Sequence, residues 1–534
     1  MAEVAVGVRK ALTKRRQLRG ARLARLIGEV RSDLGDPPLE TPALGLQRER
    51  PGVAGRQRVL DVVETGRIVT ERWSVEKRPD LILDHEGRQG RFGGVLTLGP
   101  GVAWAGRTIF RRRRAHLLDA VAPGSKNGAG VRRRHLVGLL ALLVLAAPPA
   151  AAARRGDESQ LQRRLARALR VPHVAPARSA AVALDLATGS VLYAQNPTRP
   201  LAPASNEKLP VAYAALVRLG LDFQMETDVL GEGELNGTTW SGTLVLKGGG
   251  DPTLSRAGLR SLATQVREAG IRRVSGGIVA DESFFDTRRT VAGWKPSFYI
   301  EESPPLSALV VDRARVGRYV TRSPAVAGAT AFRDVLRAAG VTVAGPVRLG
   351  RADDLSVELA AVESPPLTTI VRFMDRESDN FTAEMLLKQL GAVEVERGTS
   401  AAGASVVIQT LAGAGIPLTG VRIVDGSGLS RLDRLTASAI AALLKVAWAD
   451  PSVRPALVAS LPVAGVSGTL EDRLRKPPAR GNVLAKTGTT SDASALSGYV
   501  RTKYAFAVLQ NGHPLPYWWA RRAQDRFAQV LASQ

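Results

Sequence analysis

The spacing of apolar and polar positions divides the chain into regions of different character. Over residues 1–130, glycine and proline interrupt the apolar periodicity and clusters of arginine recur. Residues 8–30 have the spacing of a basic amphipathic helix. We therefore predict that residues 1–130 form no folded domain, and that they are either disordered or upstream of the true start of the protein.

Residues 131–153 have the order of a secretory signal peptide. The basic group Val131–His135 precedes an apolar run from Leu136 to Ala147, and small residues follow as far as Ala153. The apolar run is short for a helix that crosses a bilayer. Because a signal peptide acts at the start of a chain, and some bacteria begin translation at a valine codon, we hypothesise that Val131 is the true first residue. The alternative is an anchor at 131–153 that is not cleaved.

This stretch predicts where the protein works. Cleavage of the signal peptide would give a protein secreted to the periplasm or cell wall. If 131–153 is retained instead, it would hold the protein at the membrane.

Strand-like and helix-like segments alternate in the rest of the chain. Ala180–Asp185 and Val191–Ala194 flank a glycine turn, which predicts a β-hairpin. From residue 226 to residue 345, short strand-like runs alternate with glycine-rich turns and short helices. We interpret residues 226–345 as an inserted α+β domain.

Helical spacing returns after the predicted insertion, and a strand-like stretch follows near the C-terminus. The helical segments are 368–392, 436–448 and 518–531, and the strand-like stretch is 498–511. This order predicts an α/β (α+β) protein in which residues 154–225 and 346–534 form one domain that the insertion splits.

Composition excludes several kinds of chemistry. A chain of 534 residues with 45% hydrophobic residues has room for several globular domains. The lack of cysteine excludes disulfides, thiol catalysis and cysteine-bound zinc. No His-Glu-x-x-His sequence occurs, and the glycine-rich turn Lys247–Leu254 lacks the lysine and hydroxyl that end a phosphate-binding loop. We therefore expect no metal and no cofactor.

The net charge leaves two interpretations open. A formal charge of +25 favours an anionic partner such as cell wall, membrane surface or nucleic acid. An arginine-rich composition spread over a solvated surface accounts for the charge equally well.

The first candidate site is the pair Ser205 and Lys208, which opens an apolar helical run. Residues three apart share one face of a helix, so the Lys208 amine is expected beside the Ser205 hydroxyl. A serine hydroxyl becomes a nucleophile when a neighbouring base takes its proton, and a lysine serves if burial or another cation lowers its pKa. The spacing alone is weak, because Ser74–Lys77 matches it as well.

Two further motifs complete a set. Ser378-Asp379-Asn380 lies at an irregular point within a helical stretch, and Lys486-Thr487-Gly488-Thr489 lies where a strand is expected. Ser-x-x-Lys, Ser-Asp-Asn and Lys-Thr-Gly in this order occur in penicillin-binding proteins and class A β-lactamases.

The chain from about Ala180 to Asn511 resembles the low-molecular-mass penicillin-binding proteins of the D-Ala-D-Ala carboxypeptidase/endopeptidase family, peptidase family S13. Besides the three motifs, the resembling stretches are 249–254, 363–367, 425–430 and 461–466. The resemblance implies a β-lactamase/transpeptidase-like domain, with an antiparallel sheet flanked by helices and a smaller inserted α+β domain. It does not extend to residues 1–130.

The resemblance also implies a reaction and its partners. The enzyme would cut the bond between two D-alanines of a peptidoglycan stem peptide through an acyl-enzyme, and β-lactam antibiotics would acylate the same serine. Peripheral contact with the cell wall is a further expectation, and nucleic acid is not an expected partner.

Each motif residue receives a role through the resemblance. Ser205 is the nucleophile and Lys208 the general base. Ser378 relays a proton to the leaving amine and Asn380 holds the substrate amide. Lys486 keeps the site positive, lowers the pKa of Lys208 and attracts the terminal carboxylate. The substrate-binding residues are Thr487, Gly488 and Thr489, with the two threonines on the carboxylate. The backbone N–H groups of Ser205 and Thr489 would form the oxyanion hole.

Two features depart from the family pattern. Pro210 follows Ser205 closely, so a helix that begins near Ala204 should be distorted at Asn206, whose carbonyl the proline ring crowds. The interval from Ser205 to Ser378 is short for the longer members, with room for one inserted domain.

Four alternatives remain from the sequence. A serine β-lactamase uses the same trio, but the Glu-x-x-x-Asn pattern of class A enzymes is absent after Asn380. A histidine triad would have to use His173 or His513, and neither lies in a motif. The third is a non-catalytic wall-binding protein. The fourth is a cytoplasmic protein that binds nucleic acid through 1–130.

Overall fold

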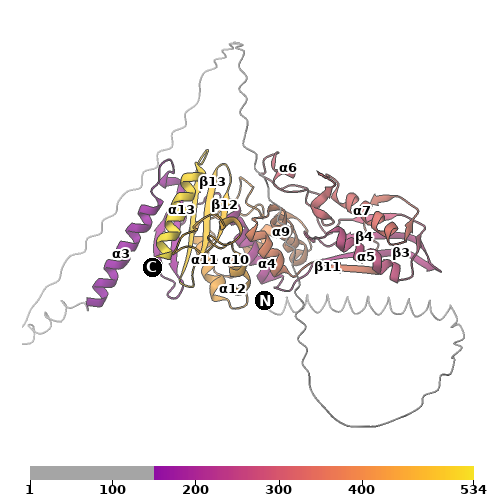
Figure 1. Ribbon diagram of the computed structural model, residues 1–534, viewed down its shortest axis with the longest axis horizontal. Coiled ribbons are helices and arrows are strands. Elements are labelled where there is room, and N and C mark those ends of the chain that lie inside the picture. The colour runs from indigo at the N-terminus through magenta and orange to yellow at the C-terminus, as the bar shows by residue number, and fades with distance from the viewer. Residues whose placement is uncertain (1–148) are drawn as a thin grey trace, which may run out of the picture. The chain divides into compact units, whose positions relative to one another are not determined.

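The computed structural model describes residues 149–534, which are coloured in Figure 1. The predicted unfolded segment 1–130, its amphipathic helix 8–30 and most of the predicted signal peptide lie outside these residues. The first described element is the helix α3 (Pro149–Leu169). Within residues 149–534, none of the helices has both the length and the hydrophobicity needed to cross a membrane.

A five-stranded antiparallel sheet carries the C-terminal part of the chain. Its strands, in spatial order, are β12 (Val483–Thr489), β13 (Ala493–Val500), β14 (Tyr504–Asn511), β1 (Ser179–Asp185) and β2 (Val191–Gln195). The predicted hairpin is confirmed as β1–β2, and the strand-like stretch 498–511 is the end of β13 and all of β14. Strand β12 lies at one edge of the sheet.

Both faces of this sheet are covered, which is why β13 is buried along its whole length. Phe506 and Val508 point to one side and pack with residues of α3 and of α13 (Tyr517–Ala532). Ala507 and Leu509 point to the other side and pack against a layer of helices. Strand side chains alternate between faces, so a strand with helices on both sides is apolar throughout. The expected antiparallel sheet flanked by helices is confirmed.

Seven helices follow β2 in this part of the protein. They are α4 (Lys208–Arg218), α8 (Leu367–Arg376), α9 (Asn380–Val395), α10 (Ser400–Gly413), α11 (Ala437–Ala449), α12 (Arg454–Ser460) and the closing α13. Asp379, Thr399 and Thr436 cap α9, α10 and α11, and each side chain accepts a hydrogen bond from the third residue of its helix.

Pro210 is accommodated because the active helix begins later than expected. Ala204–Glu207 forms a 3₁₀ turn and α4 starts at Lys208. Pro210 therefore lies in the first turn of α4, where a missing N–H costs no helical hydrogen bond. The distortion that the sequence predicts takes the form of this 3₁₀ turn.

Residues 226–363 build a second sheet with its own apolar core. Five strands follow the order β10 (Val347–Leu349), β6 (Ile278–Asp281), β4 (Thr239–Gly248), β3 (Glu226–Asn236) and β11 (Val357–Glu363), and short strands β5 (Arg273–Val274) and β9 (Thr342–Val343) extend it. Helices α5 (Arg256–Glu268) and α7 (Pro324–Ala338) pack on it around Trp240 and Phe332. The domain limits of 226 and 345 stay a prediction, and the strand pairing continues to Glu363.

A segment of the second part reaches the first. Between β6 and α7, Arg313 pairs with Asp379, Trp294 donates a hydrogen bond to Asp425, and Lys295 donates one to Ser491. These contacts bring residues 291–313 beside the N-terminus of α9, the loop that contains Asp425 and the loop between β12 and β13 that contains Ser491.

Candidate active site

Three segments that are far apart in sequence meet at one pocket. Lys208 Nζ lies 3.1 Å from Ser205 Oγ and 2.8 Å from Asn380 Oδ1. Lys486 Nζ lies 2.8 Å from Ser378 Oγ. The pocket has a volume of about 260 Å³ and is lined by Ser205, Glu302, Ser378, Asn380, Gly428, Leu429, Thr469, Arg473, Thr487, Gly488, Thr489, Thr490 and Arg521. The structure thus brings all the sequence-predicted site residues together.

The 3₁₀ turn Ala204–Glu207 places Lys208 beside Ser205. In such a turn residues i and i+3 eclipse, so Lys208 lies directly along the turn from Ser205. Ala204 has a positive φ of 47°, a conformation that costs a residue with a Cβ free energy. Ser205 therefore lies on a tight, strained entry to α4.

Ser378 lies in the short break between α8 and α9, with a positive φ of 57°. Asp379 holds this break in place: it accepts from Thr382 N at 2.7 Å and pairs with both terminal nitrogens of Arg313 at 3.1 and 2.7 Å. Burial raises the pKa of Asp379, but the hydrogen bonds and charge of Arg313 and the hydrogen bonds from Thr382 outweigh it and hold the pKa below its usual value. Asp379 is therefore a charged anchor for its two neighbours.

Strand β12 approaches the 3₁₀ turn closely because Gly488 has no side chain. A Cβ on Gly488 would lie 3.0 Å from both Pro203 O and Ser205 N, closer than packing normally allows. The Asn206 side chain donates to Lys486 O at 3.0 Å, which ties the turn to the strand. The edge of the sheet and the start of α4 are therefore in direct contact.

The substrate-binding candidates lie along the outer end of β12. Thr487 Oγ1 is 2.7 Å from Thr469 Oγ1, and Thr489 is exposed, with its hydroxyl 2.8 Å from Gly488 O. Arg521 Nη2 lies 3.5 Å from the Thr489 hydroxyl. This side of the pocket therefore combines hydroxyl groups with positive charge.

Both amines are fully buried, and burial is the main influence on each. Burial lowers the pKa of Lys208 to about 8, although carboxyl groups led by that of Asp425 act in the opposite direction. Burial, followed by repulsion from Lys208, lowers the pKa of Lys486 to about 7, against the opposite effect of Asp375. The resemblance implied that Lys486 lowers the pKa of Lys208, whereas for Lys208 burial is the leading cause.

Several contributors were not identified from the sequence. Asp375 is buried near Lys486 and accepts from Ser460 Oγ at 2.6 Å, and burial raises the pKa of Asp375 to about 6. Glu302 accepts from Asn380 Nδ2 through its backbone carbonyl at 3.1 Å. Lys208 also donates to the Ser427 carbonyl at 2.8 Å. Of these residues, only Ser427 could have been suspected from the sequence, because it lies in the stretch 425–430 that resembles the family.

The two histidines that the structure describes, His173 and His513, lie away from this pocket. The His173 ring lies 6.3 Å from that of Trp519, and His513 Nδ1 lies 3.1 Å from Asp492 Oδ1. Neither of them lines the pocket, so within residues 149–534 no histidine is placed to act as a base for Ser205. Across residues 149–534, no three histidine, aspartate or glutamate side chains are arranged to hold a metal ion.

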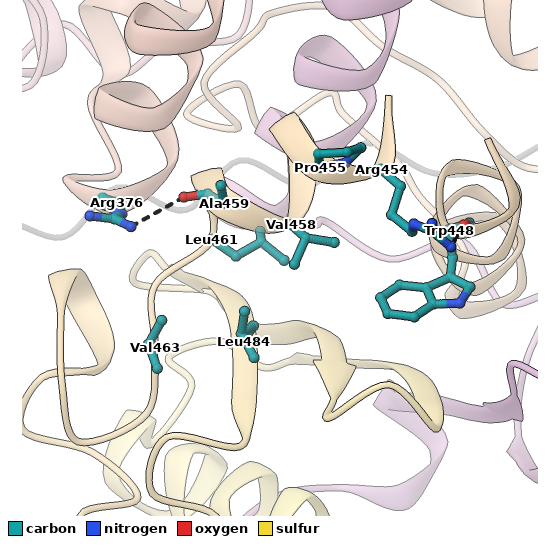
Figure 2. Close-up of a pocket in the computed structure, with 9 residues that line it drawn as sticks. All are labelled: Arg376, Trp448, Arg454, Pro455, Val458, Ala459, Leu461, Val463 and Leu484. Atoms are coloured by element: carbon teal, nitrogen blue, oxygen red, sulfur yellow. Dashed lines mark hydrogen bonds between the residues drawn. The ribbon is translucent and has the colours of Figure 1, made fainter. Parts of the chain in front are cut away.

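A second pocket of about 350 Å³ borders the same elements away from the nucleophile. Figure 2 shows its lining: Arg376, Trp448, Arg454, Pro455, Val458, Ala459, Leu461, Val463 and Leu484. Arg376 Nη2 donates to Ala459 O at 3.2 Å, the dashed line in the figure. Apolar side chains and two arginines line this pocket, so the reactive groups belong to the first one.

The chain is similar in sequence to known proteins. The family model described as D-Ala-D-Ala carboxypeptidase 3 (S13) matches residues 161–331 and 316–534. The chain is 34% identical over 454 residues to a D-alanyl-D-alanine carboxypeptidase of Actinomadura sp. (strain R39), a match covering 68% of this chain and 82% of the relative. It is 32% identical over 378 residues to the carboxypeptidase DacB of Mycolicibacterium smegmatis, covering 65% and 79%.

A solved structure shares the fold. Penicillin binding protein 4 of Haemophilus influenzae superposes with a TM-score of 0.62 at 23% identity, covering 70% of this chain and 98% of that one. This likeness shows that the five-stranded sheet, its helices and the second sheet belong to one known architecture.

The buried amine of Lys486 leads to a prediction about stability. The pKa of Lys486 is about 7 in the folded protein, against 10.5 for an ordinary lysine, so unfolding takes up a proton between these values. The free energy of unfolding of the wild type should therefore rise with pH over this window relative to Lys486→Met, which has no amine to titrate. Urea denaturation of both proteins at several pH values measures the difference. Lys476→Met, at an exposed lysine, is the control, and its free energy of unfolding should follow that of the wild type across this window. A pH-dependent difference between Lys476→Met and the wild type as large as that for Lys486→Met would contradict burial as the cause.

Proposed function

The chain belongs to the D-Ala-D-Ala carboxypeptidase 3 (S13) family and is a serine-type D-Ala-D-Ala carboxypeptidase, and we propose that Ser205 is its nucleophile. One observation carries this assignment: the buried Lys208 amine lies 3.1 Å from the Ser205 hydroxyl. A general base must lie within hydrogen-bond reach of the proton it removes, and its pKa should be near the working pH. Lys208, with a pKa of about 8, meets both conditions.

Acylation follows from this geometry. Ser205 Oγ attacks the carbonyl carbon between the two D-alanines of a stem peptide, and Lys208 takes the hydroxyl proton. The tetrahedral oxyanion accepts hydrogen bonds from the backbone N–H groups of Ser205 and Thr489; one such donor is commonly worth about 3 kcal/mol of barrier. When the carbon–nitrogen bond breaks, Ser378 gives its proton to the leaving D-alanine amine and takes up the proton that Lys208 removed from Ser205. Water then hydrolyses the ester and frees Ser205.

Substrate binding uses the groups around this centre. Asn380 Oδ1 is engaged by Lys208, so its Nδ2, which now donates to the Glu302 carbonyl, is the donor available to a substrate amide. Thr487, Thr489 and the charge of Lys486 bind the terminal carboxylate, and Gly488 gives the strand its close approach. A β-lactam presents its carboxylate and reactive carbonyl in a similar arrangement, so it would acylate Ser205 as well.

We propose that the protein works outside the cytoplasm on peptidoglycan. The sequence of 131–153 supports export, and its last residues lie at the start of α3, ahead of the folded part. The formal charge of +25 would favour peripheral contact with an anionic wall. We also propose that residues 154–225 and 346–534 form the penicillin-binding domain, and that the inserted domain starts at 226.

The nucleophile can be tested with a fluorescent penicillin. The wild type should take up a stable label, because the acyl-enzyme forms on Ser205, and Ser205→Ala should take up none. Labelling is read from a denaturing gel, and the labelled peptide is identified by mass. Ser491→Ala, at an exposed serine beyond β12, is the matched control. A labelled Ser205→Ala protein would refute the assignment, and rapid loss of the label from the wild type would indicate a β-lactamase.

Replacing the proposed base should slow the chemistry without unfolding the protein. Lys208→Ala removes the proton acceptor, so the rate constant of penicillin acylation should fall by roughly two to four powers of ten. Stopped-flow fluorescence measures this rate, and thermal melting establishes that the variant is folded. Lys476→Ala controls for the loss of one positive charge. Acylation at the wild-type rate in Lys208→Ala would show that another group is the base.

The export proposal predicts the N-terminus of the natural protein. Cleavage after the small residues that end at Ala153 would leave a mature chain that begins near Arg154. N-terminal sequencing of protein purified from the source cells reads this directly. A natural protein that retains 131–153 would instead support the uncleaved anchor.

A further inference from the structure

The Lys208 amine has a third partner outside the three motifs. Besides Ser205 and Asn380, Nζ donates to the Ser427 carbonyl at 2.8 Å. Ser427 belongs to the turn 425–430, and none of the three catalytic motifs lies in this turn. All three partners of the amine are within ordinary hydrogen-bond distance, so each helps to determine where the amine lies.

One carboxylate controls the orientation of that peptide. The Ser427–Gly428 peptide group presents its carbonyl to Lys208 and its N–H to Asp425 Oδ1, at 2.7 Å. Because a peptide group is planar, the position of its N–H fixes the direction of its carbonyl. Asp425 thus determines where the Ser427 carbonyl points.

Asp425 is itself fully buried and held on both oxygens. Its Oδ2 accepts from Ser430 N at 2.7 Å, from Trp294 Nε1 at 2.8 Å and from Ser427 Oγ at 3.1 Å. A carboxylate has acceptors only, which suits the four donors that bond these two oxygens. An asparagine would have to direct its NH₂ group at one of these donors.

The rest of the turn is fixed as well. Glu384, one helical turn after Asn380 on α9, accepts from Gly426 N at 3.0 Å and Ser427 N at 2.9 Å. Gly428 has a positive φ of 83°, and a Cβ there would lie 1.9 Å from Ala204 O. The turn is therefore packed directly against the residue that precedes Ser205.

We propose that Asp425 is a positioning residue of this enzyme, which orients the Ser427 carbonyl toward Lys208 and so sets both the place and the proton affinity of that amine. The proposal rests on the role of Lys208 as the general base. It assigns a function to the stretch 425–430, which the three motifs leave unexplained.

The charges around Lys208 agree with this role. Among the carboxyl groups that raise the pKa of Lys208, Asp425 has the largest effect, ahead of Asp379, Glu384 and Asp375. The other charged or titratable groups nearby are Lys486 on β12, Glu207 in the 3₁₀ turn and Asp433 behind Asp425. Loss of the Asp425 charge should therefore favour the neutral amine at a lower pH.

The test is the pH dependence of penicillin acylation in Asp425→Asn. The rate constant should rise with pH as Lys208 loses its proton; in the variant this rise should shift to lower pH by about half a unit or more, and the plateau should fall by about tenfold or more. A defect that only loosens the fold would lower the plateau without shifting the rise. Asp281→Asn, another fully buried aspartate that accepts two backbone N–H groups, is the control, and its profile should match the wild type.

The outcomes separate this inference from the proposed function. If the wild type labels at Ser205 and Asp425→Asn keeps the wild-type profile, the positioning role of Asp425 is wrong and the enzyme assignment stands. If the wild type does not label at Ser205, the proposed function itself fails. Should Asp425→Asn not fold, Trp294→Phe removes one donor to Asp425 but keeps the charge. Its plateau should fall several-fold without a shift to lower pH, whereas Asp281→Asn, which disturbs a buried hydrogen-bonded carboxylate away from the site, should keep the wild-type plateau. An unchanged plateau in Trp294→Phe, or an equal fall in Asp281→Asn, would overturn the proposal.

Discussion

The site depends on two lysine amines that are buried in one crevice beside a serine. Lys208 and Lys486 are both fully buried, and the free energy of removing an ammonium group from water is large unless acceptors and opposite charges replace that water. The fold supplies three oxygen acceptors to Lys208 and two to Lys486. These acceptors hold the two amines in place, yet the pKa values of Lys208 and Lys486 stay at about 8 and about 7. An amine with such a pKa is partly neutral near neutral pH, so it can accept a proton from a hydroxyl group.

This balance explains why the site is built from so many parts of the chain. The 3₁₀ turn, the break between α8 and α9 and the edge strand β12 each contribute one or two side chains. The second sheet contributes through the segment that ends at Arg313, which anchors Asp379, and through Trp294, which donates to Asp425. The inserted part therefore supports the catalytic elements directly, and its loss would remove the Arg313 pair from Asp379 and the Trp294 donor from Asp425.

The sequence predicts those features that depend on local spacing. Ser205 and Lys208 are neighbours because they are three residues apart. The alternation of segments predicted an α/β (α+β) protein, and the family resemblance implied an antiparallel sheet flanked by helices; the structure confirms both. The Ser427 carbonyl, Arg313 and Glu302 could not be found in this way. Their roles depend on contacts with residues about 66 to 219 positions away, and a backbone carbonyl carries no side-chain signal.

Two glycines show how closely these parts approach one another. At Gly488 a side chain would meet the backbone of Ser205, and at Gly428 it would meet the carbonyl of Ala204, so both sides of the nucleophile's turn are in backbone contact with other segments. Contacts of this kind leave little freedom for the turn to adjust when the acyl-enzyme forms. Catalysis benefits from groups that are already in position, because no free energy is then spent on reorganising them during the reaction. The close packing on each side of Ser205 is therefore part of the catalytic arrangement as much as the amines themselves.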